Sequence, residues 1–128
     1  VLKKGCYSAI VNVSSVGAVR NGPSGTNDCA YNATKAGVNM LTKHCAYEFA
    51  GDTIKVNAVM PASVNTPMRV EYLKKYPDLA ANAAKTKPLA PHCTEPEHIA
   101  AAILFCCDPA CPTMTGETIM IDSGNNLV

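Results

Sequence analysis

The sequence predicts an α/β fold in which parallel strands alternate with helices. Three short β-branched or apolar runs are separated by two longer stretches whose apolar residues follow helical spacing. The order strand, helix, strand, helix, strand favours parallel strands joined by right-handed crossover helices. With 128 residues, 48% of them hydrophobic, the chain is long enough for one domain with a core.

The first predicted strand is Ala9–Val13, a β-branched run too short for a helix. It ends in Ser14 and Ser15. Residues 16–27 contain several glycines and a proline, which predict a loop.

The first predicted helix extends from about Asp28 to about Ala50. Its apolar residues form two faces. One face consists of Val38, Leu41, Cys45 and Phe49, and the other consists of the mostly small residues Ala33, Ala36, Gly37 and Met40. A helix that is apolar on two sides is covered on two sides, so we expect its own sheet on one side and a second subunit of a homo-oligomer on the other.

Two further strands are predicted in the second half of the chain. Ile54–Val59 is closed by Pro61, and Thr118–Ile121 follows a Thr-Gly turn. Between them, residues 68–84 are polar and interrupted by Pro77, which predicts one or two short helices outside the core.

The second long helix is predicted from its start signal. Thr94-Glu95-Pro96-Glu97 has the pattern of a capping box with proline in the first turn. We expect the helix to run to Cys107. The residues expected to face the core are Ile99, Ile103 and Leu104.

Charge and hydropathy argue against several partners. The net charge of +1 favours neither nucleic acid nor an anionic membrane surface. No apolar run approaches the roughly 20 residues of a membrane span. We also find no positively charged and then apolar segment of the kind that forms a secretory signal peptide.

The seven cysteines do not form a disulfide framework or a C-x-x-C motif. Two ligand sets for a metal are conceivable: Cys106 and Cys107 with Cys111, or His92 and Cys93 with His98. Because these positions lie mostly in apolar stretches, we interpret them as reduced thiols, expect no metal, and expect an intracellular, cytoplasmic protein.

Tyr31 and Lys35 are the candidate catalytic pair. They are four residues apart and therefore lie on one face of the predicted helix, one turn apart. A phenol is a poor base at neutral pH, and a nearby ammonium and the positive end of a helix both favour its anionic form. The pair predicts acid/base chemistry by the tyrosine.

Ser14 and Ser15 follow the first strand, at the edge where open α/β sheets place ligands. A serine hydroxyl there could bind the reacting oxygen beside the phenol. Residues 61–68 follow the second strand at the same edge and could line a cofactor pocket.

The ordered set of short motifs strongly resembles the short-chain dehydrogenase/reductase family. The matching segments are Ile10–Ser15, Tyr31–Val38, Ile54–Pro61, Thr66–Met68, Met114–Gly116 and Ile121–Gly124. The resemblance covers nearly the whole chain. It implies the C-terminal part of a doubly wound, Rossmann-type parallel sheet.

The resemblance also implies the chemistry. Ser15, Tyr31 and Lys35 would be catalytic, with Tyr31 as acid/base. Tyr31 and Lys35 would also bind the cofactor, Lys35 at the nicotinamide ribose. The residues near the nicotinamide would be Pro61, Ala62, Val64 and Thr66. The protein would transfer hydride between NAD or NADP and a small molecule with a carbonyl or secondary hydroxyl group.

Departures from the family pattern keep other readings open. The glycine-rich phosphate loop would lie upstream, so we expect residues 1–128 to be a single partial domain, the catalytic half. Ala62 replaces the usual glycine, and the loop before Tyr31 is about three residues longer than usual, so Ser15 is preferred over Ser14 only because of the strand end. The alternatives are an epimerase or dehydratase on the same fold, or a truncated, non-catalytic interaction module.

Overall fold

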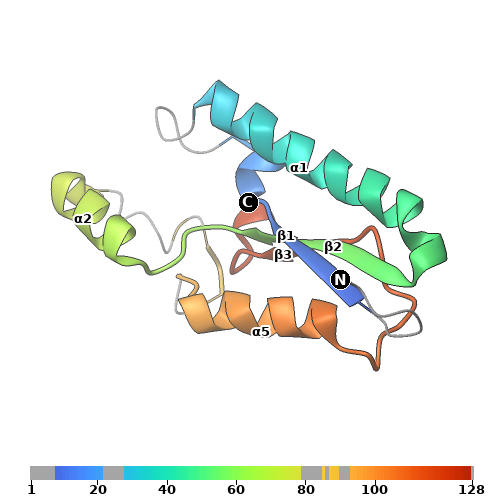
Figure 1. Cartoon of the computed structure of the whole chain (residues 1–128). Helices are drawn as coiled ribbons and strands as arrows, with labels where there is room; N and C mark the ends of the chain where they lie inside the picture. The colour runs from blue at the N-terminus through green and yellow to red at the C-terminus, as the bar shows by residue number, and fades with distance from the viewer. Residues whose placement is uncertain (1–7, 22–27, 79–84, 86, 90–92, 128) are drawn as a thin grey trace.

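A three-stranded parallel sheet forms the centre of the computed structural model (Figure 1). The strands are β1 (Ser8–Val13), β2 (Ile54–Pro61) and β3 (Thr118–Ile121), in the order β1-β2-β3. The structure describes residues 8–21, 28–78, 85, 87–89 and 93–127. The predicted α/β fold with parallel strands is confirmed, and β2 extends through Pro61 where the sequence predicted its end at Val59.

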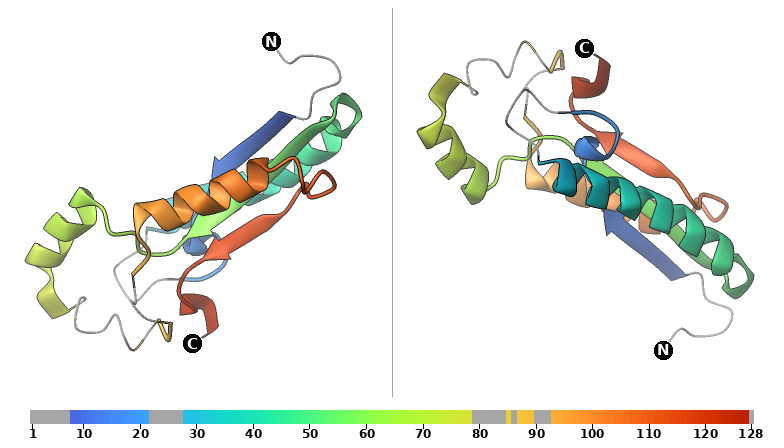
Figure 2. Two further views of the ribbon diagram at one scale, coloured as in Figure 1. Left: turned by 90° about the horizontal axis from the view of Figure 1, so that it is seen from below. Right: turned by 90° about the horizontal axis from the view of Figure 1, so that it is seen from above.

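Two long helices cover opposite faces of this sheet, α1 (Cys29–Glu48) and α5 (Pro96–Cys107) (Figures 1 and 2). Between them, every residue of β2 is buried. One core cluster joins β2 to α1 through Ala46, Ile54 and Val56, and the other joins it to α5 through Val59, Ile99 and Cys106. The central strand is therefore held from both sides.

The face of α1 toward the sheet agrees with the predicted stripe at Cys45 and Phe49, which pack against the core, and differs from it at Leu41. Leu41, predicted to face the core, is 54% exposed, whereas Thr42 is fully buried. The Thr42 hydroxyl donates to the Val38 carbonyl at 2.8 Å and accepts from the Asn12 amide of β1 at 2.9 Å. The hydrogen-bonded pair of Thr42 and Asn12 therefore lies between α1 and the sheet, where the apolar pattern predicted Leu41.

The start of α5 also differs from the prediction. The capping box is formed by Glu95 and His98, not by Thr94 and Glu97, and Pro96 lies in the first turn. Thr94 is buried and extended because its backbone pairs with the segment after β2: its N–H donates to the Ser63 carbonyl at 3.2 Å. This long-range pairing moves the helix start by one residue.

Within α5, the predicted core positions are only partly correct. Ile99 is buried and Ile103 packs against the core, but Leu104 is 70% exposed and Cys106 takes the buried position. Burial raises the pKa of the Cys106 thiol, with a smaller contribution from Cys107.

The segment after β2 forms α2 (Pro67–Lys75), which stands apart from the sheet in both views of Figure 2 and buries no residue. This confirms a short helix in the predicted excursion. Residues 79–84, which make up most of the second half of this predicted excursion, lie outside the described part of the chain. Among the described residues, none of the helices has the length and apolar character needed to cross a bilayer.

Candidate active site

The carboxyl end of β1 and the first turns of α1 meet at the same edge of the sheet. Asp28 caps α1 by accepting from the Ala30 N–H at 3.0 Å, which fixes where the helix begins and places Tyr31 in its first turn. After β1, a single turn of 3-10 helix, η1 (Val16–Ala18), packs against α1. The candidate serines and the candidate tyrosine and lysine are therefore brought together.

Ser15 and Tyr31 flank the same point in space. Ser15 Oγ accepts from the Gly17 N–H at 3.1 Å and so caps η1. The ideal Cβ position of Gly17 lies 3.4 Å from Ser15 Oγ and 3.4 Å from Tyr31 Cε1. Because Tyr31 is 44% exposed, its ring remains accessible from outside.

Ser14 has different surroundings. It is buried, its hydroxyl donates to the Lys35 carbonyl at 3.1 Å, and its backbone N–H donates to the Val59 carbonyl at 2.8 Å. These bonds hold α1 and β2 against the end of β1. The Ser14 hydroxyl is therefore already engaged in the fold.

Lys35 lies between the helix and the end of β1. Its ammonium donates to the Val13 carbonyl at 2.9 Å and lies 5.8 Å from the centroid of the Tyr31 ring. At this distance the cation attracts the face of the ring electrostatically.

The four predicted cofactor-lining residues lie along one stretch that leaves the same sheet edge. Pro61 is the buried last residue of β2, and the Ala62 N–H donates to the Ile121 carbonyl at 3.1 Å. Val64 forms a parallel bridge with Thr94, and Thr66 caps α2 by accepting from the Arg69 N–H at 3.3 Å. Within the described residues, none of the four makes a hydrogen bond to Ser15, Tyr31 or Lys35.

This stretch is held by a pair of side chains that the sequence did not indicate. The Asn65 amide donates to both carboxylate oxygens of Glu95, at 3.2 and 3.1 Å. Asparagine after a strand and glutamate before a helix are common, so no local signal distinguished this pair.

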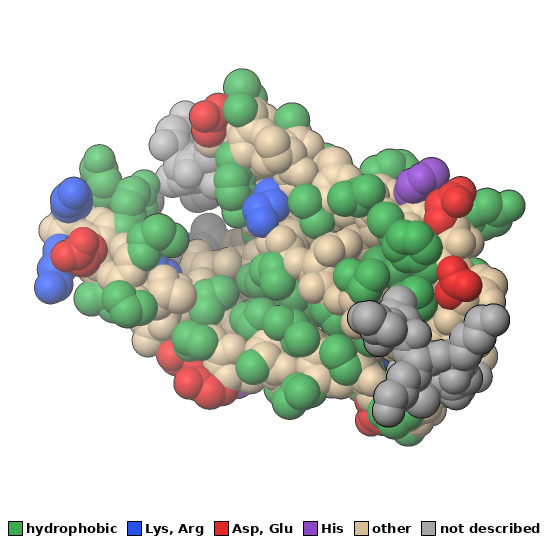
Figure 3. Space-filling view, in the orientation of Figure 1, with side chains coloured by type: hydrophobic (Ala, Val, Ile, Leu, Met, Phe, Trp, Pro, Cys, Tyr) green, Lys and Arg blue, Asp and Glu red, His purple; other side chains and the backbone are tan. Residues whose placement is uncertain are grey.

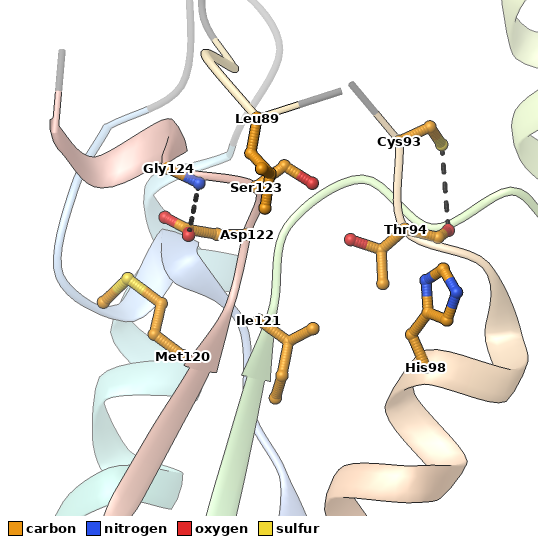
Figure 4. A pocket seen from close by; sticks show the side chains of 9 residues that line it. All are labelled: Leu89, Cys93, Thr94, His98, Met120, Ile121, Asp122, Ser123 and Gly124. Carbon is orange, nitrogen blue, oxygen red and sulfur yellow. Dashed lines mark hydrogen bonds between the residues drawn. The ribbon is translucent and has the colours of Figure 1, made fainter. Parts of the chain in front are cut away.

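A cavity of about 460 Å³ opens between the end of β3 and the start of α5 (Figure 4). Its described lining residues are Leu89, Cys93, Thr94, His98, Met120, Ile121, Asp122, Ser123 and Gly124. The Asp122 carboxylate accepts from the N–H groups of Gly124 and Asn126, at 2.9 and 2.7 Å. The motif Ile121–Gly124 marked this turn in the sequence without indicating a role for it.

Of the two sets considered as metal ligands, Cys106, Cys107 and Cys111 are all described, whereas the other set includes His92 and is described only in part. In the part of the chain that the structure describes, no three His, Cys, Asp or Glu side chains are grouped in a way that could hold a metal ion. His92 lies outside the described residues. The six described cysteines are all free thiols.

These observations define a class of protein. It is a doubly wound, Rossmann-type α/β protein with a serine, a tyrosine and a lysine at the carboxyl edge of the sheet. Residues 1–126 match the family model described as enoyl-(acyl carrier protein) reductase. The chain belongs to the short-chain dehydrogenase/reductase family.

Relatives in sequence and in structure agree with this assignment. The chain is 36% identical to a tropinone reductase homolog of Arabidopsis thaliana, over 97% of this chain and 39% of the relative. It is 40% identical to the 3-oxoacyl-(acyl-carrier-protein) reductase FabG of Thermotoga maritima, over 91% of this chain and 44% of the relative. A 3-oxoacyl-(acyl-carrier protein) reductase with bound NAD from Brucella melitensis superposes with a TM-score of 0.78 and 31% identity, over 91% of this chain and 40% of that one. The chain thus spans less than half the length of these proteins.

Proposed function

We propose that the intact protein containing this chain is an NAD(P)-dependent oxidoreductase that acts on a small molecule with a carbonyl or secondary hydroxyl group. The observation that carries the proposal is the placement of Ser15 and Tyr31 around Gly17, with the Lys35 ammonium 5.8 Å from the tyrosine ring. The Brucella melitensis structure, which holds NAD, supports the choice of cofactor.

The three side chains divide the work at the substrate oxygen. Ser15 Oγ accepts from the Gly17 N–H, which leaves its own hydroxyl proton to be donated to the substrate oxygen. Tyr31 donates the proton to that oxygen during reduction and removes it during oxidation, and the Lys35 ammonium stabilises the phenolate that remains. A nicotinamide cofactor, when bound, would supply or accept the hydride.

The residues present fit the nicotinamide end of the dinucleotide. Lys35 carries its ammonium at the sheet edge, where it donates to the Val13 carbonyl and would bind a ribose hydroxyl of the cofactor. Pro61, Ala62, Val64 and Thr66 form a stretch leading away from the same edge, anchored by the Val64–Thr94 bridge. These four residues would line the nicotinamide.

The exposed face of α1 supports a homo-oligomer. Ala33, Ala36, Gly37 and Met40 are exposed, and small residues allow close approach of a second helix. We further infer a reducing, cytoplasmic environment, because the described cysteines are free thiols.

The test is Tyr31→Phe in the full-length protein. This change removes the proton-transferring oxygen and keeps the ring, so turnover should fall by about 10²- to 10⁴-fold while the dissociation constant of NAD(P)H, measured by fluorescence, stays within about twofold. Lys35→Ala should impair both turnover and cofactor binding. Full turnover by Tyr31→Phe would refute the proposed chemistry.

A further inference from the structure

Asn32, which lies directly after Tyr31 in α1, contacts two parts of the segment that follows Ser15. Its amide nitrogen donates to Asn21 Oδ1 at 3.0 Å. Its amide oxygen faces Gly17, because an ideal Cβ on Gly17 would lie only 2.6 Å from Asn32 Oδ1. This oxygen is buried and accepts no hydrogen bond from the described residues.

Asn32 packs against Gly17, the residue that both the candidate serine and the candidate tyrosine border. Gly17 is buried, its N–H donates to Ser15 Oγ, and its ideal Cβ position lies 3.4 Å from both Ser15 Oγ and Tyr31 Cε1. Because a Cβ contact of 2.6 Å essentially never occurs in proteins, a methyl group on Gly17 would displace either the Asn32 amide, and with it its bond to Asn21, or the backbone at position 17. The Asn32 amide therefore fills the space that any side chain at position 17 would need.

We infer that Asn32 is a positioning residue that, together with Gly17 and Asn21, sets the separation between the Ser15 hydroxyl and the Tyr31 phenol. This inference rests on the proposed function. Both oxygens must reach one substrate oxygen at hydrogen-bond distance, and a misplacement of about 1 Å can lower turnover about 10²-fold. Asn32 acts through Gly17 and Asn21, and not on the substrate.

The experiment compares Gly17→Ala, Asn32→Ala and the double variant in the full-length protein. Each single change should lower kcat by about 10- to 100-fold, because each lets the segment after Ser15 shift relative to Tyr31. The double variant should be no worse than the poorer single variant, because the new methyl group enters the space that the amide leaves. The dissociation constant of NADH or NADPH should stay within about twofold in all three variants, since Lys35 and residues 61–66 are untouched.

Asn39→Ala is the matched control. Asn39 lies on the same helix, its Oδ1 is also buried without a hydrogen-bond partner among the described residues, and its amide nitrogen donates to Met60 Sδ at 3.2 Å. We expect a loss of thermal stability similar to that of Asn32→Ala, with kcat within about twofold of the unchanged protein. A loss of kcat confined to Asn32→Ala separates positioning from general destabilisation.

Two results would overturn the inference: an Asn32→Ala enzyme with unchanged kcat, or single losses that multiply in the double variant. If Gly17→Ala does not fold, Asn21→Ala replaces it, because Asn21 is exposed and removing its side chain frees the Asn32 amide. Its kcat should fall with cofactor binding unchanged, and an unchanged kcat would count against the inference. An active Tyr31→Phe enzyme would refute the proposed function instead, whatever Asn32 does.

Discussion

Ser14 and Ser15 are neighbours in the chain with opposite surroundings. The Ser14 hydroxyl donates to the Lys35 carbonyl inside the fold, whereas Ser15 Oγ accepts from the Gly17 N–H. Ser15 Oγ and the Tyr31 ring both border the ideal Cβ position of Gly17. A strand end followed by two serines predicts that one of them is available to a ligand. Which of the two serines is available depends on the direction of its hydroxyl. The direction of the Ser14 hydroxyl is set by its bond to Lys35 of α1, which lies 21 residues further along the chain.

Exchanging each serine for alanine in the full-length protein should separate their roles. Ser15→Ala should lower kcat by about 10²-fold or more, because it removes the donor to the substrate oxygen. Ser14→Ala should lower the free energy of unfolding by about 1 kcal/mol, because it breaks the bond to Lys35, with a small effect on kcat. Steady-state kinetics and thermal denaturation measure the two effects, and the reverse pattern would make Ser14 the catalytic serine.

At the scale of elements, the strands and helices were largely predictable and their exact faces were not. Thr118–Ile121 was predicted without error because a short run rich in β-branched residues after a turn is a local signal. The capping box at Thr94, by contrast, was misplaced because Thr94 pairs with the segment after β2, about 30 residues away. Likewise, Leu41 and Leu104 lost their predicted core positions to Thr42 and Cys106, through contacts with other elements that no periodicity contains.

The pairing between that segment and the start of α5 leads to a prediction about cofactor binding. Asn65→Asp places a carboxylate against Glu95, which should loosen the stretch carrying Val64 and Thr66. The dissociation constant of NAD(P)H should rise about three- to tenfold, a modest effect because the pair is partly exposed, with kcat at saturating cofactor nearly unchanged.

The double variant Asn65→Asp/Glu95→Gln exchanges donor and acceptor and should restore binding. Glu97→Gln, on the same turn of α5 with an exposed side chain, serves as the control for the loss of a negative charge. If the double variant does not restore the affinity for NAD(P)H, the Asn65–Glu95 pair does not hold the stretch that carries Val64 and Thr66.

At the scale of the whole molecule, β1 leaves an apolar edge exposed. Ile10 is 41% and Val13 is 48% exposed, and within the described residues β1 pairs only with β2. Figure 3 shows hydrophobic side chains gathered on this face between α1 and α5. The chain spans 39% and 44% of the two relatives described above. An unpaired apolar edge of this kind favours association with other chains.

We therefore expect residues 1–128, expressed alone, to self-associate and to bind dinucleotide weakly. The backbone amides that cradle a diphosphate in Rossmann-type folds lie in the first strand–helix turn of the sheet, which the resemblance places outside this chain. Size-exclusion chromatography and titration with NADH test both points. A monodisperse monomer with micromolar affinity would show that this stretch is a complete binding domain.

The buried lysine of the central strand restricts which changes the molecule can tolerate. Lys55 is 3% exposed, and its ammonium donates to the main-chain carbonyls of Asp108 and Cys111, at 2.7 and 3.1 Å. Because both acceptors are main-chain carbonyls, replacing the side chain of Asp108 or Cys111 does not remove them. An insertion or deletion between α5 and β3 would instead move the carbonyls away from a buried ammonium. The length and path of this turn are therefore more constrained than its amino-acid identities.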